Sequence, residues 1–283
     1  MKIRFAVSPG GGSLDPDLYR TLVDGLEARR FDTIWLSDIP LGGSIEPVVG
    51  LAIAAARTTR LKLGANVVPI GRSPVQLAKQ LAQLDQLSAG RLLLMRVPGV
   101  GTPAERAALG IEGRDRGVEL ERIIVTLRER WAEGASRPVQ EPLELWFGGL
   151  GPRALDRAGR LSDGWLGAAM TPAEVTVAVG QINEAASAAG REIDPEHFGM
   201  SIGYARSDPG GAPFEAVRTR RPDVDPRVLI PVGADALHRL LDEYVAAGCS
   251  KFVLRPITGG AGDVGDVEEE LDWLAAEVLP LQT

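Results

Sequence analysis

Residues 61–91 read LKLGANVVPIGRSPVQLAKQLAQLDQLSAGR and show the unit from which the fold is built. The first eight residues form a short apolar run of the kind that makes a buried strand, and a polar loop follows. Pro74 then opens a helix, because proline is tolerated at the first helical position. Leu77, Leu81 and Leu84 share one face of that helix. The stretch predicts a strand, a loop, a helix and the approach to another strand.

The same alternation runs along the whole chain. We predict strands at 2–8, 31–37, 61–68, 91–97, 143–148, 164–169, 198–205 and 251–255. The clearest helices are predicted at 16–29, 47–57, 74–87, 118–131, 235–246 and 267–278. Eight apolar strands, each followed by a helix, favour a closed (β/α)₈ TIM barrel over an open doubly wound sheet.

The chain is expected to form a single domain over residues 1–283. Its hydrophobic fraction of 45% and mean hydropathy of +0.01 allow one large core. Prolines and glycines gather at 208–226, where we expect a long surface excursion between the seventh strand and its helix. No linker divides the sequence.

Charge and composition restrict the partners. A net charge of -7 and a pI near 5.1 argue against nucleic acid and anionic membranes, so small molecules and copies of itself are expected. Cys249 is the single cysteine, and His197 and His238 are the two histidines. These are too few for a disulfide or a zinc site, so no metal is expected. Without a long apolar run, the expected location is cytoplasmic.

A glycine-rich turn at 148–155, with the sequence GGLGPRAL, joins the fifth strand to its helix. Gly148, Gly149 and Gly151, followed by Arg153, would present free backbone N–H groups at the positive end of a helix dipole, which suits a phosphate. The alternative is a tight turn that needs glycine only for its backbone conformation. Its spacing is not that of the Rossmann dinucleotide motif.

Charged residues follow several predicted strands, where a barrel carries its active site. Asp38 could bond a cofactor ring or transfer a proton, or it could cap a loop or helix. Glu105 is a second candidate carboxylate, with the first turn of a solvated helix as its alternative. Arg72 and Arg255 could contact an anionic cofactor tail or substrate, or remain surface arginines.

Six ordered segments resemble the luciferase-like flavin and deazaflavin oxidoreductases. They are 31–38, 46–47 together with 55–64, 72–78, 84–91, 148–149 and 162–165, and the resemblance resumes at 248–256. Within that family, the compact length favours the actinobacterial coenzyme F420-dependent branch over the light-emitting monooxygenases. The resemblance implies a luciferase-like TIM barrel with loop insertions at its C-terminal face.

The resemblance also implies site residues. Ala65, Asn66 and Val67 would lie in a bulge that backs the cofactor ring, often with a non-prolyl cis peptide, within 65–68. Gly148 and Gly149 would hold the cofactor phosphate, and Asp38 would contact the cofactor.

The sequence departs from the family pattern at two places. Ile39 stands where deazaflavin-dependent dehydrogenases commonly place a histidine that assists proton transfer. The fourth strand is bulkier than usual at Met95 and Arg96, so the pocket floor is expected to differ.

We therefore expect an F420-dependent oxidoreductase that moves hydride between the deazaflavin ring and a small organic substrate, with protonation from solvent or Glu105. One alternative is an FMN-dependent monooxygenase, with FMN as the cofactor. Another is a catalytically silent flavin or deazaflavin-binding protein. Relatives are frequently dimers, so a homodimer is expected.

Overall fold

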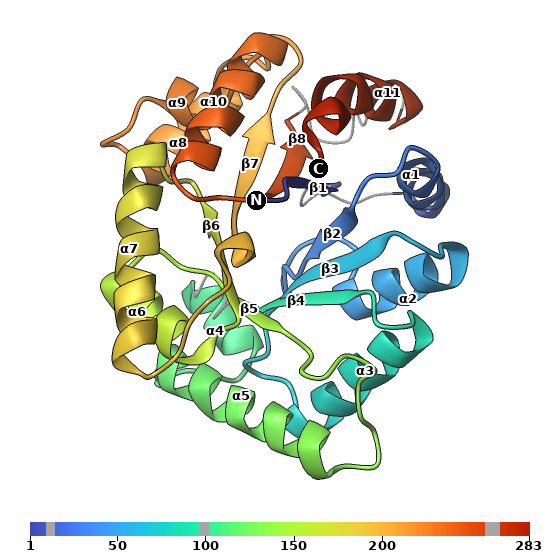
Figure 1. Ribbon diagram of the computed structural model, residues 1–283, viewed down its shortest axis with the longest axis vertical. Helices are drawn as coiled ribbons and strands as arrows, with labels where there is room; N and C mark the ends of the chain where they lie inside the picture. The colour runs from blue at the N-terminus through green and yellow to red at the C-terminus, as the bar shows by residue number, and fades with distance from the viewer. Residues whose placement is uncertain (10–14, 97–101, 258–266) are drawn as a thin grey trace.

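A computed structural model describes residues 1–9, 15–96, 102–257 and 267–283. Eight parallel strands pair in chain order and close into a barrel, as predicted. Helices surround the strands when the molecule is viewed down its shortest axis (Figure 1). The strands are β1 (Arg4–Val7), β2 (Thr33–Ser37), β3 (Lys62–Val67), β4 (Leu92–Arg96), β5 (Leu145–Phe147), β6 (Gly164–Ala168), β7 (Phe198–Tyr204) and β8 (Lys251–Pro256).

Most helices begin at a proline that follows a capping side chain. Asp15, for example, accepts hydrogen bonds from the backbone N–H groups of Asp17 and Leu18, and Pro16 follows it. The helices are α1 (Pro16–Ala28), α2 (Pro47–Arg57), α3 (Pro74–Leu87), α4 (Pro103–Ala108), α5 (Arg116–Glu133), α6 (Pro152–Leu161), α7 (Pro172–Ala188), α8 (Gly211–Arg220), α9 (Pro226–Leu229), α10 (Ala234–Ala246) and α11 (Val267–Val278). Two short 3₁₀ turns cover Pro195–His197 and Leu279–Leu281.

Alternate residues of each strand face the barrel interior and the surrounding helices. On β8, Phe252 and Leu254 join the large core beneath the helices, whereas Val253 joins a smaller cluster inside the barrel. That interior cluster consists of Ala6, Trp35, Met95, Trp146, Leu166 and Val253. Met95 therefore packs inside the barrel.

The segment 208–226 is more regular than expected. It contains α8, although Phe214 is the only residue of that helix that is buried. Proline and glycine dominate its sequence pattern, so the weak apolar periodicity of the helix was not recognised. The segment lies between β7 and α10 and is mostly exposed, as the predicted surface excursion requires, but the helix within it was not predicted.

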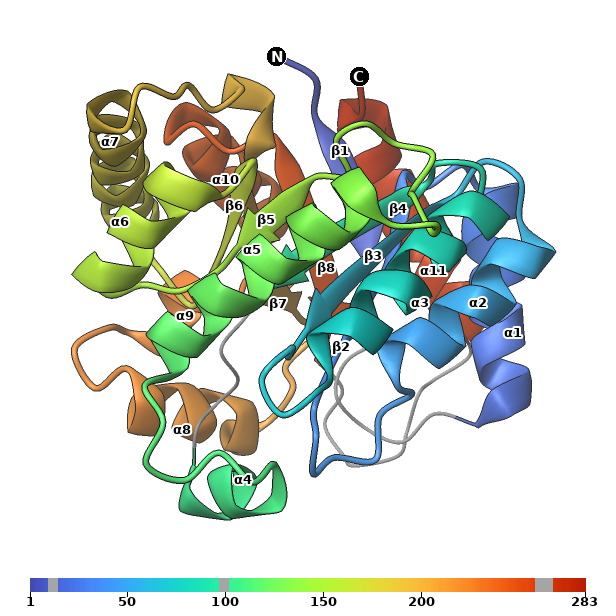
Figure 2. The same cartoon turned by 90° about the horizontal axis from the view of Figure 1, so that it is seen from below.

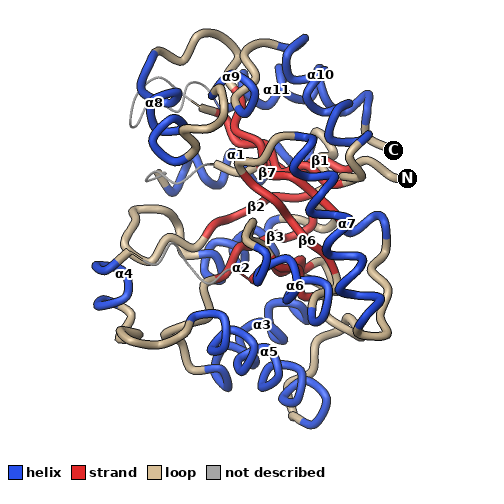
Figure 3. Tube along the Cα trace, turned by 90° about the vertical axis from the view of Figure 1, so that its left-hand side faces the viewer, coloured by secondary structure: helices blue, strands red, loops and turns tan. Residues whose placement is uncertain are grey.

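The two ends of the barrel differ. Figures 2 and 3 place α4 and α8 beyond the C-terminal ends of the strands, and both chain termini at the opposite end. The end that carries α4 and α8 is called the mouth below. None of the helices in the described ranges is long and apolar enough to cross a membrane.

Candidate functional site

The inward-facing positions at the mouth follow from the strand register. Position 203 on β7 pairs with 255 on β8, and both are two residues beyond the inward-facing pair Ser201 and Val253. On other strands, too, the residue two positions beyond an inward-facing residue of the interior cluster lies at the mouth. These inward-facing residues are Ser8, Ser37, Asn66, Gly148, Ala168, Gly203 and Arg255. Most of them are small, which leaves this end of the barrel less filled than its centre.

Asn66 is fixed inside the barrel by two neighbours on β2. Trp35 Nε1 donates to Asn66 Oδ1 at 2.8 Å, and Asn66 Nδ2 donates to Ser37 Oγ at 3.1 Å. By contrast, Ala65 and Val67 belong to the outer core beneath the helices, so their side chains point away from the mouth. Of the three residues expected to back a cofactor ring, Asn66 alone directs its side chain inward.

The expected bulge on β3 is not present. Residues from Leu63 to Val67 pair one for one with β4, from Leu92 to Arg96, without an extra residue. In the described residues, the one cis peptide bond joins Glu141 to Pro142. The prediction of a non-prolyl cis peptide at 65–68 was wrong, because β3 continues here as a regular parallel strand.

Asp38 lies just beyond β2 and is held by the loop that follows β3. Its Oδ2 atom accepts from the Val68 backbone N–H at 3.1 Å and from Arg72 Nη2 at 2.6 Å. The Asp38 side chain is only 6% exposed. The carboxylate thus joins two mouth loops, which agrees with the loop-cap alternative considered from the sequence.

Arg72 is fully engaged in the same cluster. Besides Asp38, its guanidinium donates to Glu46 Oε1 at 3.0 Å and to the Val68 carbonyl at 3.1 Å. An anion would have to displace these partners, so the geometry does not support the predicted anion contact at Arg72. The cluster borders a hollow of about 370 Å³, whose other walls include Ile39 and Leu109. Ile39 itself is partly exposed there.

The glycine turn after β5 has two distinct parts. Gly149 has φ of +119°, and a Cβ atom at this position would lie 2.7 Å from Ala154 Cβ. Gly149 is therefore required by the fold itself. A Cβ at Gly151 would meet nothing within 4 Å, and Gly151 provides no side-chain cap to α6. Among the described residues, the backbone N–H of Arg153 has no hydrogen-bond acceptor.

The first turn of α4 contains Glu105. Thr102 Oγ1 accepts from the Glu105 backbone N–H at 3.1 Å, and the Glu105 side chain is buried. The alternative considered from the sequence was a solvent-exposed Glu105 in the first turn of a helix. Because the Glu105 side chain is buried, that alternative does not apply. Glu105 thus lies at the mouth end of the molecule, on the short helix visible in Figure 2.

Arg255 is the last residue but one of β8 and is exposed to solvent. Protein nevertheless surrounds it on several sides: desolvation lowers the pKa of its guanidinium, and the nearby Arg220 lowers that pKa further. It makes no hydrogen bond or ion pair with any residue in the described ranges. Arg255 is therefore an accessible cation at the mouth, as its position after the eighth strand predicted.

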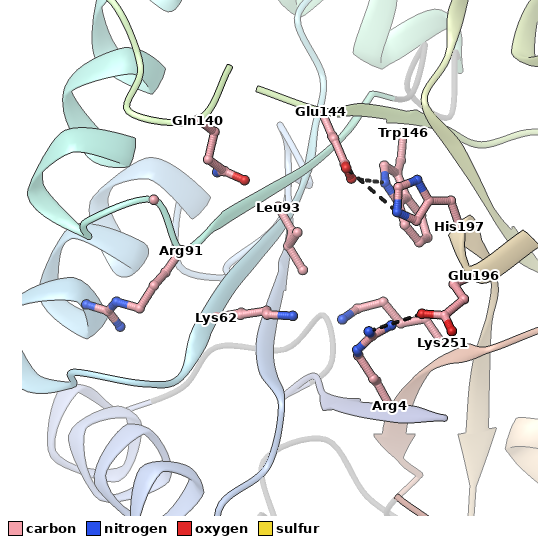
Figure 4. Close-up of a pocket in the computed structure, with 11 residues that line it drawn as sticks. Arg4, Lys62, Arg91, Leu93, Gln140, Glu144, Trp146, Glu196, His197 and Lys251 are labelled. Atoms are coloured by element: carbon pink, nitrogen blue, oxygen red, sulfur yellow. Dashed lines mark hydrogen bonds and ion pairs between the residues drawn. The ribbon is translucent and has the colours of Figure 1, made fainter. Parts of the chain in front are cut away.

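A second hollow, of about 210 Å³, lies at the opposite end of the barrel. Figure 4 shows Glu144 directed toward the neighbouring rings of Trp146 and His197, and Arg4 directed toward Glu196. The His197 ring also bonds the Asp163 carbonyl at 2.8 Å. In barrels of this type, this end stabilises the fold and the other end carries the chemistry.

Lys251 anchors that stabilising end. Its ammonium group is 2.6 Å from Asp32 Oδ2, and Lys62 approaches Asp32 Oδ1 at 3.2 Å. Burial alone would raise the pKa of Asp32, but the attraction of the two lysines outweighs it and holds that pKa well below its ordinary value. The network is a structural ion-pair cluster rather than a candidate active site.

Comparison with known proteins identifies the family. Residues 2–209 match the profile of luciferase-like monooxygenases. The chain belongs to that luciferase-like family. Over 184 residues it is 29% identical to a 5,10-methylenetetrahydromethanopterin reductase of Methanolobus tindarius, a match that covers 59% of this chain and 54% of the relative. The chain thus spans about half the length of that relative.

Solved structures agree on the fold of this luciferase-like protein. An F420-dependent secondary alcohol dehydrogenase, in complex with an F420–acetone adduct, superposes with a TM-score of 0.80 at 18% identity, covering 100% of both chains. The oxygenating constituent of 3,6-diketocamphane monooxygenase from Pseudomonas putida, in complex with FMN, gives a TM-score of 0.80 at 14% identity, covering 100% of this chain and 99% of the other. At these identities the likeness concerns the fold.

Three mouth residues were not recognised from the sequence: Ala168, Ser201 and Gly203. Each is inward-facing by strand register, and solvent reaches Ala168 and Ser201. The alternation of strand faces could have identified them once Val253 was placed in the interior. Arg220 was also missed, because the helix that carries it was not predicted.

Proposed function

We propose that this chain is an F420-dependent oxidoreductase that transfers hydride between a deazaflavin and a small organic substrate. One observation carries the proposal: α6 begins at the mouth without a side-chain cap, and open space lies in front of Gly151. Uncapped helix N-termini bind phosphate through their free N–H groups. The luciferase-like family and its reductase relative support the redox chemistry.

The residues at the mouth fit a phosphorylated cofactor with a planar ring. The free backbone N–H of Arg153, together with its exposed side chain, suits the phosphate. The absence of large side chains at Gly148, Ala168 and Gly203 leaves room for the ring beside them. Ser37 and Asn66 supply polar groups on the other side of the barrel.

When bound, the cofactor supplies the hydride chemistry, and the chain positions the reactants and excludes water. In the proposal, Gly151 and Arg153 hold the phosphate, and Asn66 presents an amide whose orientation its neighbours fix. Asp38 positions the two loops that it joins and does not itself need to react. Solvent or Glu105 supplies the proton that accompanies hydride transfer to the substrate.

An FMN-dependent monooxygenase is the second candidate. The family description and the FMN complex of a structural neighbour favour it. The same uncapped helix would hold the phosphate of FMN, so the turn after β5 does not separate the two cofactors. Ile39, in place of the family histidine, also allows a cofactor-binding protein without turnover.

The test of the proposal is a binding titration with F420 and with FMN, each followed by absorbance and fluorescence of the ring. Gly151→Asp should weaken cofactor binding by tenfold or more, about 1.4 kcal/mol. The new carboxylate would cap α6 and repel a phosphate, and it should leave thermal stability unchanged or slightly higher. Gly180→Asp is the matched control, because Gly180 is exposed on α7 and its Cβ would meet nothing within 4 Å.

Each result decides between the candidates. Tight binding of F420, lost in the Gly151 variant alone, would support the proposal. Binding of FMN without F420 would select the monooxygenase, and binding without reduction of any substrate would select the silent protein. A chain that binds neither cofactor would refute all three.

The proposal includes a homodimer, which the family resemblance implies. Light scattering of the purified 30.1 kDa chain tests it, with a mass near twice that value expected. A monomeric mass at working concentration would remove this part of the proposal.

A further inference from the structure

Two arginines at the mouth, Arg255 and Arg220, have no carboxylate partner among the residues that the structure describes. Arg255 is the last residue but one of β8, and Arg220 ends α8, the helix that Figure 2 places beyond the C-terminal ends of the strands. We infer that Arg255 and Arg220 together bind an anionic group of the substrate, a carboxylate or a phosphate. This inference rests on the proposed function for the reaction itself and adds the class of molecule on which the enzyme acts.

The position of Arg255 follows from the register of β8. Lys251, Val253 and Arg255 lie on the same face of the strand, and Val253 packs inside the barrel. Lys251 meets Asp32 at the stabilising end, so Arg255 points inward at the opposite end, the mouth. Its charge therefore lies above the barrel interior, where substrates of such enzymes bind.

Solvent reaches the inward-facing residues beside Arg255. Ala168 is exposed and Ser201 is partly exposed, although both face the interior. The Ser201 hydroxyl makes no hydrogen bond with any residue of the described ranges. This side of the mouth offers a cation and a hydroxyl to a small molecule, with no large side chain between them.

Gly203 allows the guanidinium to lie against β7. A Cβ atom at position 203 would be 3.1 Å from Arg255 Nη2 and 2.7 Å from Ile257 Cδ1. A larger residue would push the arginine or Ile257 away. The backbone of β7 thus helps to define where the charge is held.

Two arginines next in sequence or nearby have carboxylate partners, in contrast to Arg220 and Arg255. Arg206 pairs with Glu269 and Glu270, and Arg221 pairs with Glu174 and Asp223. Neither Arg220 nor Arg255 has an ion-pair partner among the described residues. Two neighbouring cations repel each other, and an oxyanion between them would relieve that repulsion while accepting charge-assisted hydrogen bonds.

The geometry favours the substrate over the cofactor as the source of this anion. The turn proposed to hold the cofactor phosphate follows β5, whereas Arg255 lies near the end of β8, three strands further round the barrel. Figure 1 shows β5 and β8 on different sides of the ring of strands. A cofactor phosphate at α6 would leave the arginines facing the space next to the ring.

The experiment compares crotonate with crotonamide, two small probes of similar shape that differ in charge. Ligand-observed NMR would give the dissociation constant of each, in cofactor-free and in cofactor-loaded protein. We expect crotonate to bind tenfold or more tightly than crotonamide, and inorganic phosphate to compete with it. In Arg255→Met this preference should fall to threefold or less, while Arg255→Lys should retain part of it.

Arg220→Met should reduce the same preference, and Arg218→Met is its control on α8. Arg218 is exposed and pairs with Glu215, so its loss should leave the preference unchanged. Thermal melting of each variant confirms that it folds.

The inference is overturned if crotonate and crotonamide bind equally, or if Arg255→Met keeps the preference. It is also overturned if Arg255→Met weakens F420 or FMN binding tenfold and leaves crotonate binding unchanged, because the cofactor would then be the source of the anion. The cofactor titration is a separate measurement. A chain that binds no cofactor yet prefers crotonate would refute the proposed function and retain the anion site.

Discussion

Asp38 and Arg72 join the loops that follow β2 and β3, with Asp38 Oδ2 2.6 Å from Arg72 Nη2. Asp38→Ala would remove the acceptor of the Val68 N–H as well as the partner of a half-buried arginine. We expect the free energy of unfolding in urea to fall by about 1–3 kcal/mol.

Asp17→Ala is the control for this change, since Asp17 forms an ion pair that is 85% exposed on the carboxylate side. It should alter stability by less than about 1 kcal/mol. Full stability of the Asp38 variant together with weakened cofactor binding would instead indicate direct contact between Asp38 and the cofactor.

Gly149 has a backbone conformation that other residues adopt only with strain. Gly149→Ala combines that strain with a close contact to Ala154, so we expect a loss of about 1–3 kcal/mol in unfolding free energy. Gly151→Ala, where φ is -77° and the space is open, should be nearly neutral. Equal stability of the two variants, measured by urea unfolding, would contradict this distinction.

The lowered pKa of Asp32 leads us to expect a specific dependence of folding stability on pH. Its pKa in the folded protein lies below its unfolded value, so it binds protons less readily when folded. Its stabilising contribution is therefore complete above the unfolded pKa of about 3.9 and is lost as the pH falls through the lower folded pKa. We expect Asp32→Asn to cost about 3 kcal/mol at neutral pH.

The difference between wild type and the Asp32 variant should stay constant from pH 7 to about pH 5 and shrink only below about pH 4. Asp272→Asn, which alters a carboxylate that is 71% exposed, should show a much smaller difference. A difference that disappears already near neutral pH would contradict the assignment.

Cys249 is buried, and burial raises the pKa of its thiol to about 12. The reactive thiolate is therefore scarce at neutral pH. Native protein should not react with a disulfide reagent such as DTNB, whereas protein unfolded in urea should release one equivalent of thionitrobenzoate per chain. Rapid modification of the native protein would show that the connection between α10 and β8 opens readily.

Local signals in the sequence predicted much of the fold. Pro16, Pro47 and Pro74 each open a helix as expected, because the proline and the residue before it act within one turn. The apolar runs predicted all eight strands, although β5 is shorter than expected. The helix α8 was missed because only one of its side chains contributes to the core.

The site was predicted less completely, because its contacts join distant parts of the chain. The positions of Asp38 and Arg72 after consecutive strands were recognised, but not their pairing across 34 residues. Strand ends indicate which residues reach the mouth, whereas the partner of each charge depends on loop conformation. The expected cis peptide came from resemblance alone, and the register of β3 overrides it.

Gly148, Ala168 and Gly203 have no side chain larger than a methyl group, which leaves room at one side of the mouth. Ala168 is exposed to solvent, so a longer side chain could be added there, whereas a Cβ atom at Gly203 would lie 2.7 Å from Ile257 Cδ1. In the proposed reaction, a graded series from alanine through valine to leucine at position 168 should therefore act as a size filter on substrates. It would offer protein engineers a means to tune which molecules the enzyme admits.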